Sequence, residues 1–189
     1  CGAAATNSAS LTVNENVVVV SAPASLTKCP GTSASFAVSA TGTGLSYQWY
    51  KGGNLLASQT GSSLVLSSVS AADAGTYSVV VSGTCGTPLT RSATLSVNQE
   101  VLIVSAPANV TKCPRTKATF EVEATGTALT YQWYKGGALL PGENDSRLRL
   151  GPVSAADAGT YSVVVSGACG AAVTNSATLT VNEDVMVTS

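Results

Sequence analysis

The chain repeats itself with a period of 84 residues, and this repeat is the strongest constraint on its fold. Residues 17–100 match residues 101–184 at about 55 of 84 positions without a gap. The matches include a set of cysteines, tryptophans, aspartates and tyrosines: Cys29 and Cys113, Trp49 and Trp133, Asp73 and Asp157, Tyr77 and Tyr161, Cys85 and Cys169. A unit that recurs without insertions predicts one domain in each repeat.

The same register assigns the two ends of the chain. Cys1 aligns with Cys85, and residues 11–14 align with residues 95–98. We therefore expect residues 1–16 to be the last strand of a preceding repeat and residues 185–189 to begin a following one. Because the first residue is a cysteine and not a methionine, we expect the sequence to be one part of a longer tandem array.

Each repeat has the pattern of short β-strands separated by turns. Residues 35–39, 46–49 and 63–66 alternate small or polar with apolar side chains, and glycine, serine, threonine and asparagine interrupt the strands. The only helical signal is a single turn at residues 70–73. About seven short strands in 84 residues predict an all-β domain built as a β-sandwich.

The composition argues against several classes of function. The chain has no histidine, so the usual Ser-His-Asp and Cys-His arrangements and imidazole metal ligands are absent from its sequence. A net charge of −1 offers no electrostatic attraction to nucleic acid. The longest aliphatic run, residues 17–20, is far shorter than the roughly 20 residues of a membrane-spanning helix. We therefore expect no enzyme, no cofactor, no nucleic-acid partner and no membrane span.

Two motifs in each repeat resemble those of immunoglobulin-like domains of the intermediate set, in the tandem form found in bacterial surface proteins. The first resembles the strand C core tryptophan with its turn, and the second the turn between strands E and F with its tyrosine corner. They lie at residues 49–53 and 133–137, and at residues 73–77 and 157–161. The resemblance implies a Greek-key sandwich in each of 17–100 and 101–184. It also gives Trp49, Trp133, Asp73, Asp157, Tyr77 and Tyr161 structural roles in the core.

The cysteines depart from the immunoglobulin pattern. The places of the usual bridge between the sheets hold valine: Val38 and Val79, and again Val122 and Val163. In the implied fold Cys29 and Cys85 lie at opposite poles of one domain, too far apart for a disulfide. The resemblance therefore implies an inter-domain bridge from Cys29 to Cys169, with Cys1, Cys85 and Cys113 bonded to repeats outside the window. Free thiols, a bridge within a domain or between chains, and metal ligation are the alternatives.

The two repeats differ most in surface charge. Residues 101–184 carry 13 charged residues (6 basic, 7 acidic), whereas residues 17–100 carry 5 (3 basic, 2 acidic). Four of the new charges fall on the implied strands B and E and predict a cross-strand ladder: Glu121, Glu123, Arg147 and Arg149. The simpler interpretation of these residues is a solvated charged face. The more specific one is a surface that docks a neighbouring rod-shaped array of such repeats.

Other candidate sites have simple structural explanations. Glu143, Asn144 and Asp145 form an acidic loop that suits calcium but is more often only solvated. Asn109 and Asn144 match the N-glycosylation pattern, and in a bacterial chain we expect them unmodified. Lipidation of Cys1 is an alternative to its place in the repeat, and an exposed Tyr50 or Tyr134 would suit sugar stacking.

These observations favour a structural function. Only residues 98–100 separate the last predicted strand of one repeat from the first of the next, which is too short and too poor in glycine for a flexible hinge. We expect an extracellular filament or stalk of rigid, disulfide-linked domains, whose partners are further copies of the same repeat. The alternative is an adhesin or a carbohydrate-targeting spacer that binds a glycan or cell-surface ligand.

Overall fold

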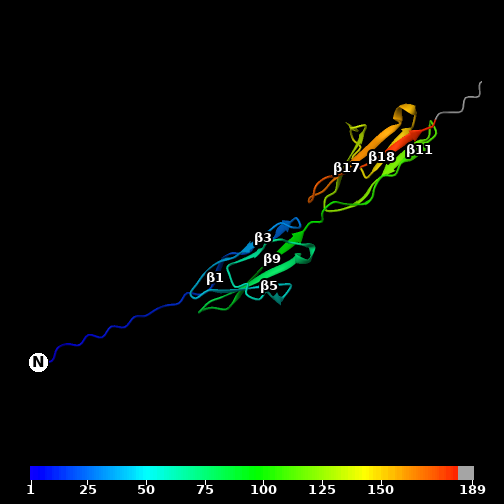
Figure 1. Ribbon diagram of the computed structural model, residues 1–189. Helices are drawn as coiled ribbons and strands as arrows, with labels where there is room; N and C mark the ends of the chain where they lie inside the picture. Colours follow the sequence, from blue (N-terminus) through cyan, green and yellow to red (C-terminus); the bar gives the residue numbers. More distant parts are fainter. Residues whose placement is uncertain (183–189) are drawn as a thin grey trace, which may run out of the picture. The chain divides into compact units, whose positions relative to one another are not determined.

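The computed structural model describes residues 1–182, which form an all-β chain that divides into two compact units (Figure 1). Unit 1 comprises Cys1–Lys28 and Thr32–Ser96, and unit 2 comprises Cys29–Gly31 and the chain from Val97 onward. No helix within residues 1–182 is long and apolar enough to cross a membrane. The expected start of a following repeat, residues 185–189, lies outside the described residues.

The strands of unit 1 are short and are separated by turns, as the sequence pattern predicts. They are β1 (Val18–Ser21), β2 (Leu26–Lys28), β3 (Ala34–Ala37), β4 (Ser39–Thr41), β5 (Ser46–Lys51), β6 (Asn54–Leu55), β7 (Ser63–Leu66), β8 (Gly75–Ser82) and β9 (Leu89–Val97). The single helical turn predicted at residues 70–73 is confirmed as the 3₁₀ turn η1 (Ala71–Asp73).

Unit 2 has the same elements in the same order. They are β10 (Leu102–Ser105), β11 (Val110–Lys112), β12 (Lys117–Glu121), β13 (Glu123–Thr125), β14 (Thr130–Lys135), β15 (Ala138–Leu139), β16 (Arg147–Pro152), the 3₁₀ turn η2 (Ala155–Asp157), β17 (Gly159–Ser166) and β18 (Val173–Val181).

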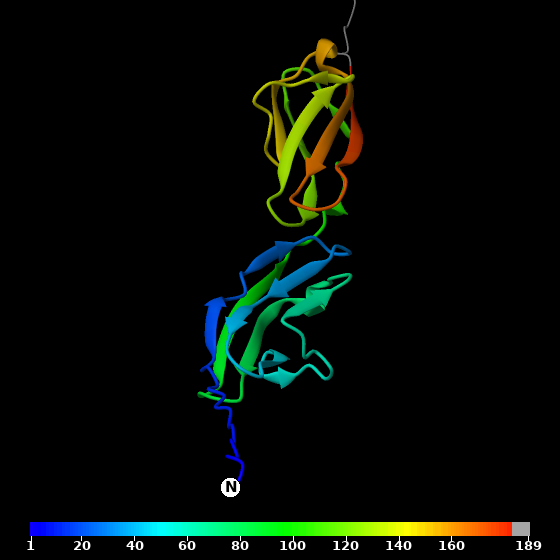
Figure 2. The ribbon, with the colours of Figure 1, turned by 90° about the vertical axis from the view of Figure 1, so that its left-hand side faces the viewer.

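Each unit is a sandwich of two layers (Figure 2). One layer of unit 2 is a five-stranded sheet in the order β11-β18-β17-β14-β15, and the other contains the pairs β10-β13 and β12-β16. Because β12 and β13 are successive parts of one strand, these two pairs lie in a single layer. The chain changes layer between β13 and β14 and again between β16 and β17, which is Greek-key topology. Unit 1 has the same order, β2-β9-β8-β5-β6 opposite β1-β4 and β3-β7. The prediction of immunoglobulin-like sandwiches is confirmed.

A buried proline divides the first strand of each sandwich between the two layers. In unit 2, Pro107 lies between β10, which pairs antiparallel with β13, and β11, which pairs parallel with β18. Proline has no amide hydrogen for a ladder, so a strand is interrupted where it occurs. Pro23 occupies the same place in unit 1. The interruption lets one segment contribute to both layers and close the sandwich.

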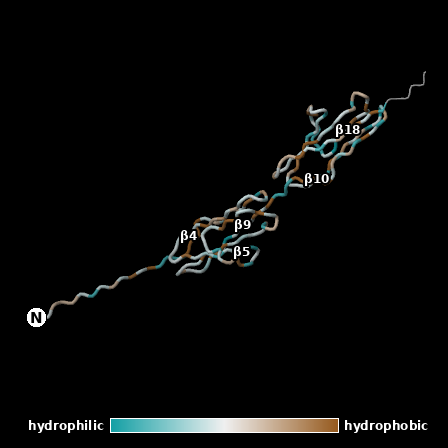
Figure 3. The backbone as a smooth tube through the Cα atoms, viewed as in Figure 1, coloured by the Kyte–Doolittle hydropathy of each residue, from teal (hydrophilic) through white to brown (hydrophobic). Residues whose placement is uncertain are grey.

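The core of each sandwich combines buried aromatic and aliphatic side chains. Coloured by hydropathy, the backbone of both units alternates between hydrophobic and hydrophilic stretches (Figure 3). In unit 2, Phe120 lies 6.2 Å from Trp133 and 5.1 Å from Tyr161 between ring centroids. Val122 and Val163, in the places of the usual immunoglobulin cystine, are 2% and 0% exposed. Apolar packing therefore replaces the disulfide between the sheets.

Residues 1–15 pair with no strand in the described structure, and all of them are exposed. The nearest ladder contact is an isolated parallel bridge between Asn16 and Cys85. Leu11 and Val13 are 90% and 78% exposed. The segment thus carries apolar side chains that nothing in residues 1–182 covers.

Candidate functional site

The signature tyrosine of each unit forms a tyrosine corner beneath its 3₁₀ turn. The hydroxyl of Tyr161 donates a hydrogen bond of 2.8 Å to the carbonyl oxygen of Asp157, and Tyr77 bonds Asp73 in the same way at 2.9 Å. Burial, and then the charge of Asp157, raises the pKa of Tyr161. The four-residue hydrogen bond ties the turn to the first residues of β17, so this tyrosine has a structural role.

The aspartate of each corner caps its own turn. In unit 2, the backbone N–H and the hydroxyl of Ser154 donate to the Asp157 carboxylate at 2.7 Å and 2.9 Å. These two hydrogen bonds, backbone first, lower the pKa of Asp157, and the charge of Lys135 contributes in the same direction. The pKa of Asp73 is lowered by the equivalent bonds from Ser70 and by Lys51. Both carboxylates therefore stabilise a turn.

The acidic loop of unit 2 is held by the core tryptophan. The indole N–H of Trp133 donates to the carbonyl oxygen of Asp145 at 2.8 Å, and its backbone N–H donates to the carbonyl oxygen of Glu143 at 3.0 Å. Gln132, which was not singled out from the sequence, donates from Nε2 to Leu140 and Glu143. The first repeat has the identical residue, Gln48, at the equivalent position, and this identity is the sequence feature that could have indicated its role. The carbonyl oxygens of this loop therefore accept hydrogen bonds from the core residues. Residues 1–182 contain no group of three His, Cys, Asp or Glu side chains that could hold a metal ion.

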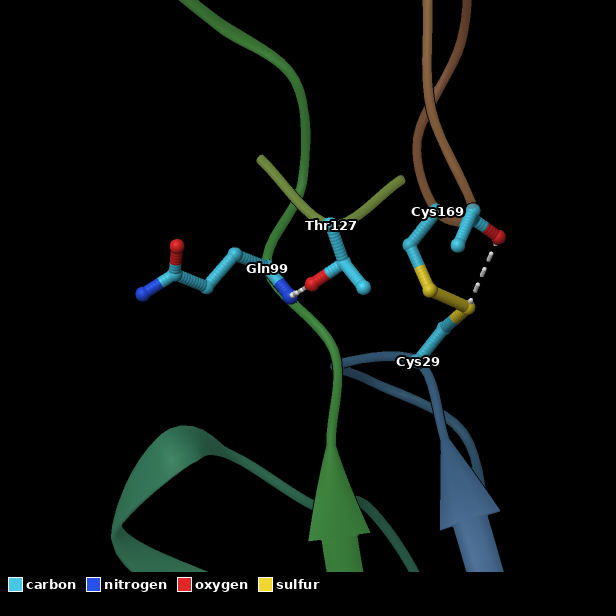
Figure 4. Close-up of a disulfide and its surroundings, with 5 residues drawn as sticks. Cys29, Gln99, Thr127 and Cys169 are labelled. Atoms are coloured by element: carbon cyan, nitrogen blue, oxygen red, sulfur yellow. Dashed lines mark hydrogen bonds between the residues drawn. A yellow bond between two sulfur atoms is a disulfide. The ribbon is translucent and has the colours of Figure 1, made fainter. Parts of the chain in front are cut away.

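A disulfide joins Cys29, which follows β2, to Cys169, which lies between β17 and β18 (Figure 4). Their Cα atoms are 5.6 Å apart, within the normal range for a cystine. Cys169 is 3% exposed, and the sulfur of Cys29 lies 3.6 Å from the carbonyl oxygen of Ala168. Cys29–Gly31 packs with unit 2, so both cysteines lie in that unit.

A network of hydrogen bonds around Thr127 positions the loop that carries Cys169. The backbone N–H of Gln99 donates a hydrogen bond of 2.8 Å to the hydroxyl of Thr127 (Figure 4). The backbone N–H of Thr127 donates a hydrogen bond of 3.1 Å to the Gln99 carbonyl oxygen. Thr127 also accepts from the N–H of Ala168 at 2.8 Å. One threonine thus joins the segment before β10 to the residue before Cys169. Thr127 carries the same signal in the sequence as Gln132, because the first repeat has the identical residue, Thr43, at this position.

Unit 1 has the same network around Cys85. Thr43 bonds Glu15 through its hydroxyl and backbone, at 2.9 Å and 3.2 Å, and accepts from the N–H of Thr84 at 2.8 Å. Cys85 is half-buried and has a free thiol in this structure, whereas Cys1 and Cys113 are free and exposed. The loop that carries Cys85 is therefore formed in the same way as the loop that carries the bonded Cys169.

The structure corrects the predicted ladder of four charges. Glu121 lies opposite Arg147 and forms an ion pair of 2.6 Å, which raises the pKa of the arginine. Arg149 lies opposite Thr119 instead, and Glu123 lies on β13 opposite Ser105 of β10. The strand changes partner at the buried Val122, so the register does not bring Glu123 and Arg149 together.

The remaining candidates lie on the surface of their own sandwich. Glu121 and Glu123 line a groove of about 420 Å³ between β10, β11 and β12. Tyr50 and Tyr134 are half-buried on their strands. The side-chain oxygen of Asn109 accepts a hydrogen bond of 2.8 Å from the backbone N–H of Thr178, which anchors β11 to β18.

The sandwich topology, the core tryptophan and the tyrosine corner define an immunoglobulin-like domain. The profile of the PKD-like domain family matches residues 98–181, which is most of unit 2. A search of curated proteins finds no match to this chain.

Solved structures similar to this chain include several immunoglobulin-like proteins. Titin domains I67–I69, as an E-to-A variant, align with a TM-score of 0.77 and 20% identity over 89% of this chain and 66% of theirs. Immunoglobulin domains 1–4 of Sidekick-1 align with 0.72 and 21% over 92% and 51%. Extracellular domains 3–5 of Drosophila OTK align with 0.61 and 18% over 89% and 63%. This chain therefore spans less than two thirds of each of these structures, and at such identities the likeness shows the fold.

Proposed function

We propose that this chain is a segment of an extracellular structural protein, a bacterial filament or stalk, in which immunoglobulin-like repeats are joined in series and cross-linked by disulfides. Residues 17–100 and 101–184 are two such repeats, and residues 1–16 belong to the last strand of a preceding one. The partners of the chain are further copies of the same repeat.

The Cys29–Cys169 disulfide carries this proposal. It links a loop encoded in the first repeat to a loop encoded in the second, with 140 residues between the two cysteines. Cys113 and Cys85 occupy the equivalent loops one period away, and Cys1 occupies the place of Cys85. If each repeat bonds its neighbour in this way, Cys113 pairs with a later repeat, and Cys85 and Cys1 pair with earlier ones.

The connecting segment supports a stiff junction. Strand β9 ends at Val97 and β10 begins at Leu102, and the backbone of Gln99 between them is bonded to Thr127 at both its N–H and its carbonyl. A segment whose backbone polar groups are engaged has little freedom to bend. A covalent bridge beside it would restrict bending and twisting further.

Small-angle X-ray scattering of the full chain tests the proposal. We expect Cys29→Ser to broaden the pair-distance distribution and to smooth the features of the scattering curve. The reason is that only the short connecting segment then joins the two repeats. Cys85→Ser is the matched control, since it removes an equivalent cysteine that is not bonded here. Identical curves for wild type, Cys29→Ser and Cys85→Ser would contradict a disulfide-stiffened junction.

Electron microscopy of a chain with many repeats tests the filament itself. Strand lengths and rise predict straight rods with an axial repeat of roughly 40 Å per domain. Flexible beads on a string would refute the proposal.

A further inference from the structure

The layer of each sandwich that faces the five-stranded sheet ends in an edge strand. In unit 1, β7 pairs with β3 and with no other strand within residues 1–182, and in unit 2 β16 pairs only with β12. An edge strand has a row of backbone N–H and C=O groups that no neighbouring strand uses, so a strand of another chain can pair with it. Natural proteins block such edges with charged side chains, prolines or bulges.

The register of β7 shows which of its backbone groups are free. The N–H of Val38 donates to the carbonyl oxygen of Ser62 at 2.9 Å, so these two residues form a hydrogen-bonded pair of the ladder with β3. Hydrogen-bonded pairs alternate along an antiparallel ladder, so Leu64 belongs to the next such pair. The N–H and C=O groups of Ser63 and Val65 therefore point away from β3, toward the open edge.

The equivalent edge of unit 2 is blocked. The N–H of Val122 donates to the carbonyl oxygen of Ser146 at 3.0 Å, so the same alternation places the backbone groups of Arg147 and Arg149 at the open edge. Both residues carry a positive charge, and β16 ends at Pro152. The register between β12 and β16 also shifts near the beginning of β12. Charge, proline and bulge thus all oppose the addition of another strand to unit 2.

The edge of unit 1 lacks all three features. Strand β7 contains no charged residue and no proline, and its register with β3 is unbroken. Val65 on this strand is 61% exposed. Every other large apolar residue exposed within residues 17–182 has an exposed apolar counterpart 84 residues away, whereas the counterpart of Val65 is Arg149. The uncharged edge is therefore a property of unit 1 and does not follow from the shared fold.

We propose that β7 is a lateral association site, which pairs antiparallel with β7 of a second copy of this chain about a two-fold axis. With the two Leu64 residues opposite each other, Ser63 of each copy exchanges backbone hydrogen bonds with Val65 of the other. This register uses every free N–H and C=O group of the two residues. Neither edge carries a charge, so two copies meet without repulsion, whereas two β16 strands would bring arginines opposite each other.

This contact goes beyond the proposed function, which concerns disulfides between successive repeats of one chain. The pairing of β7 requires only the geometry of unit 1. It therefore stands or falls separately from the effect of Cys29→Ser on the scattering curve.

Sedimentation equilibrium of the full chain tests the proposal. The chain carries Cys1→Ser, Cys85→Ser and Cys113→Ser, which remove the free thiols and so prevent dimers that are linked by disulfides. A pair of short strands forms a small interface, well below the roughly 1,200 Å² of stable complexes, so the samples extend to about 1 mM. We expect a reversible equilibrium between monomer and dimer.

Two variants with equal added charge locate the contact. Ser63→Arg with Val65→Arg introduces the residues that unit 2 has at these positions, and it should weaken dimerisation at least about tenfold, because arginines of the two copies then lie opposite each other. Thr90→Arg with Ser92→Arg is the control, since it adds the same charge on exposed positions of β9 in the other sheet. The control should dimerise like the parent chain.

Hydrogen exchange measured for single amides by NMR provides a second readout that needs no substitution in β7. Raising the protein concentration should slow exchange at Ser63 and Val65, whose N–H groups become bonded, and should leave Leu64 unchanged, because its N–H already bonds β3. A chain that stays monomeric at about 1 mM would overturn the proposal. So would dimerisation that is equal in the two arginine variants, or exchange at Ser63 and Val65 that does not depend on concentration.

Discussion

Cys29 and Cys169 are 140 residues apart in sequence, yet their Cα atoms lie 5.6 Å apart and a disulfide joins them. A cross-link over such a distance removes conformational entropy from the unfolded chain. In a chain-entropy treatment, this raises the free energy of the unfolded state by about 5 kcal/mol. Within residues 1–182, the cores of the two sandwiches contain no cystine between their sheets, and Val122 and Val163 fill that place in unit 2. The disulfide therefore links two loops, while apolar packing stabilises the core of each sandwich.

The first prediction concerns the pattern of thiols. Digestion of the oxidised chain without reduction should release a peptide pair containing Cys29 and Cys169. The exposed Cys1 and Cys113 should react quickly with a maleimide in the native chain, and the half-buried Cys85 more slowly. A pair linking Cys29 to Cys85 would contradict the observed arrangement.

The second prediction concerns the acid sensitivity of unit 2. Since folding lowers the pKa of Asp157, its stabilising effect is fully present above the ordinary carboxyl pKa of about 4 and is lost as the pH falls through the lower folded value. Asp157→Asn should therefore reduce stability at pH 6 and weaken the dependence of stability on pH below about 4. Thermal unfolding measured from pH 6 to pH 2 checks this, and parallel profiles for variant and wild type would contradict it.

The third prediction concerns a glycine beside the junction segment. Gly126 has a φ of +152°, and a Cβ there would lie 2.8 Å from Leu129 Cδ2 and 3.1 Å from the Glu100 carbonyl oxygen. Gly126→Ala should destabilise unit 2 by at least about 1 kcal/mol.

Gly151→Ala is the control for this substitution. A Cβ at Gly151 would meet no atom within 4 Å, so the change should alter stability by less than about 0.5 kcal/mol. Chemical denaturation, with hydrogen exchange in unit 2 as the readout, distinguishes the two variants. Equal losses of stability in both would show that the contact with Glu100 does not matter.

The fourth prediction concerns the surface charges of β12, β13 and β16. A double-mutant cycle on Glu121 and Arg147 should reveal a small coupling at low ionic strength that disappears at about 1 M salt, because both side chains are about half exposed. The same cycle on Glu123 and Arg149 should show no coupling, since they do not lie opposite each other. Equal coupling for both pairs would support the ladder of four charges and contradict the observed register.

Much of the fold follows from local patterns in the sequence. The strands around Phe36, Trp49 and Leu64 were predictable because alternation of apolar and polar residues determines which face of a strand is buried. The tyrosine corner was expected from the resemblance to immunoglobulin-like domains, and the structure shows its hydrogen bond from Tyr161 to Asp157. The acidic loop was harder to interpret, since its backbone oxygens serve Trp133 and Gln132, and its side chains carry no sign of that role.

The sequence by itself determined the period of 84 residues and the all-β class, because these depend on recurrence along the chain and on short-range alternation. The core aromatic residues were implied by the resemblance to immunoglobulin-like domains. Only the tertiary structure decided which strands are neighbours beyond each bend. The strand that contains Glu121 and Glu123 changes partner at Val122, so one carboxylate meets Arg147 and the other faces Ser105. Thr127 likewise acquires its role only where three distant backbone segments meet. Such pairings depend on how the chain folds back over tens of residues, and no local pattern encodes them.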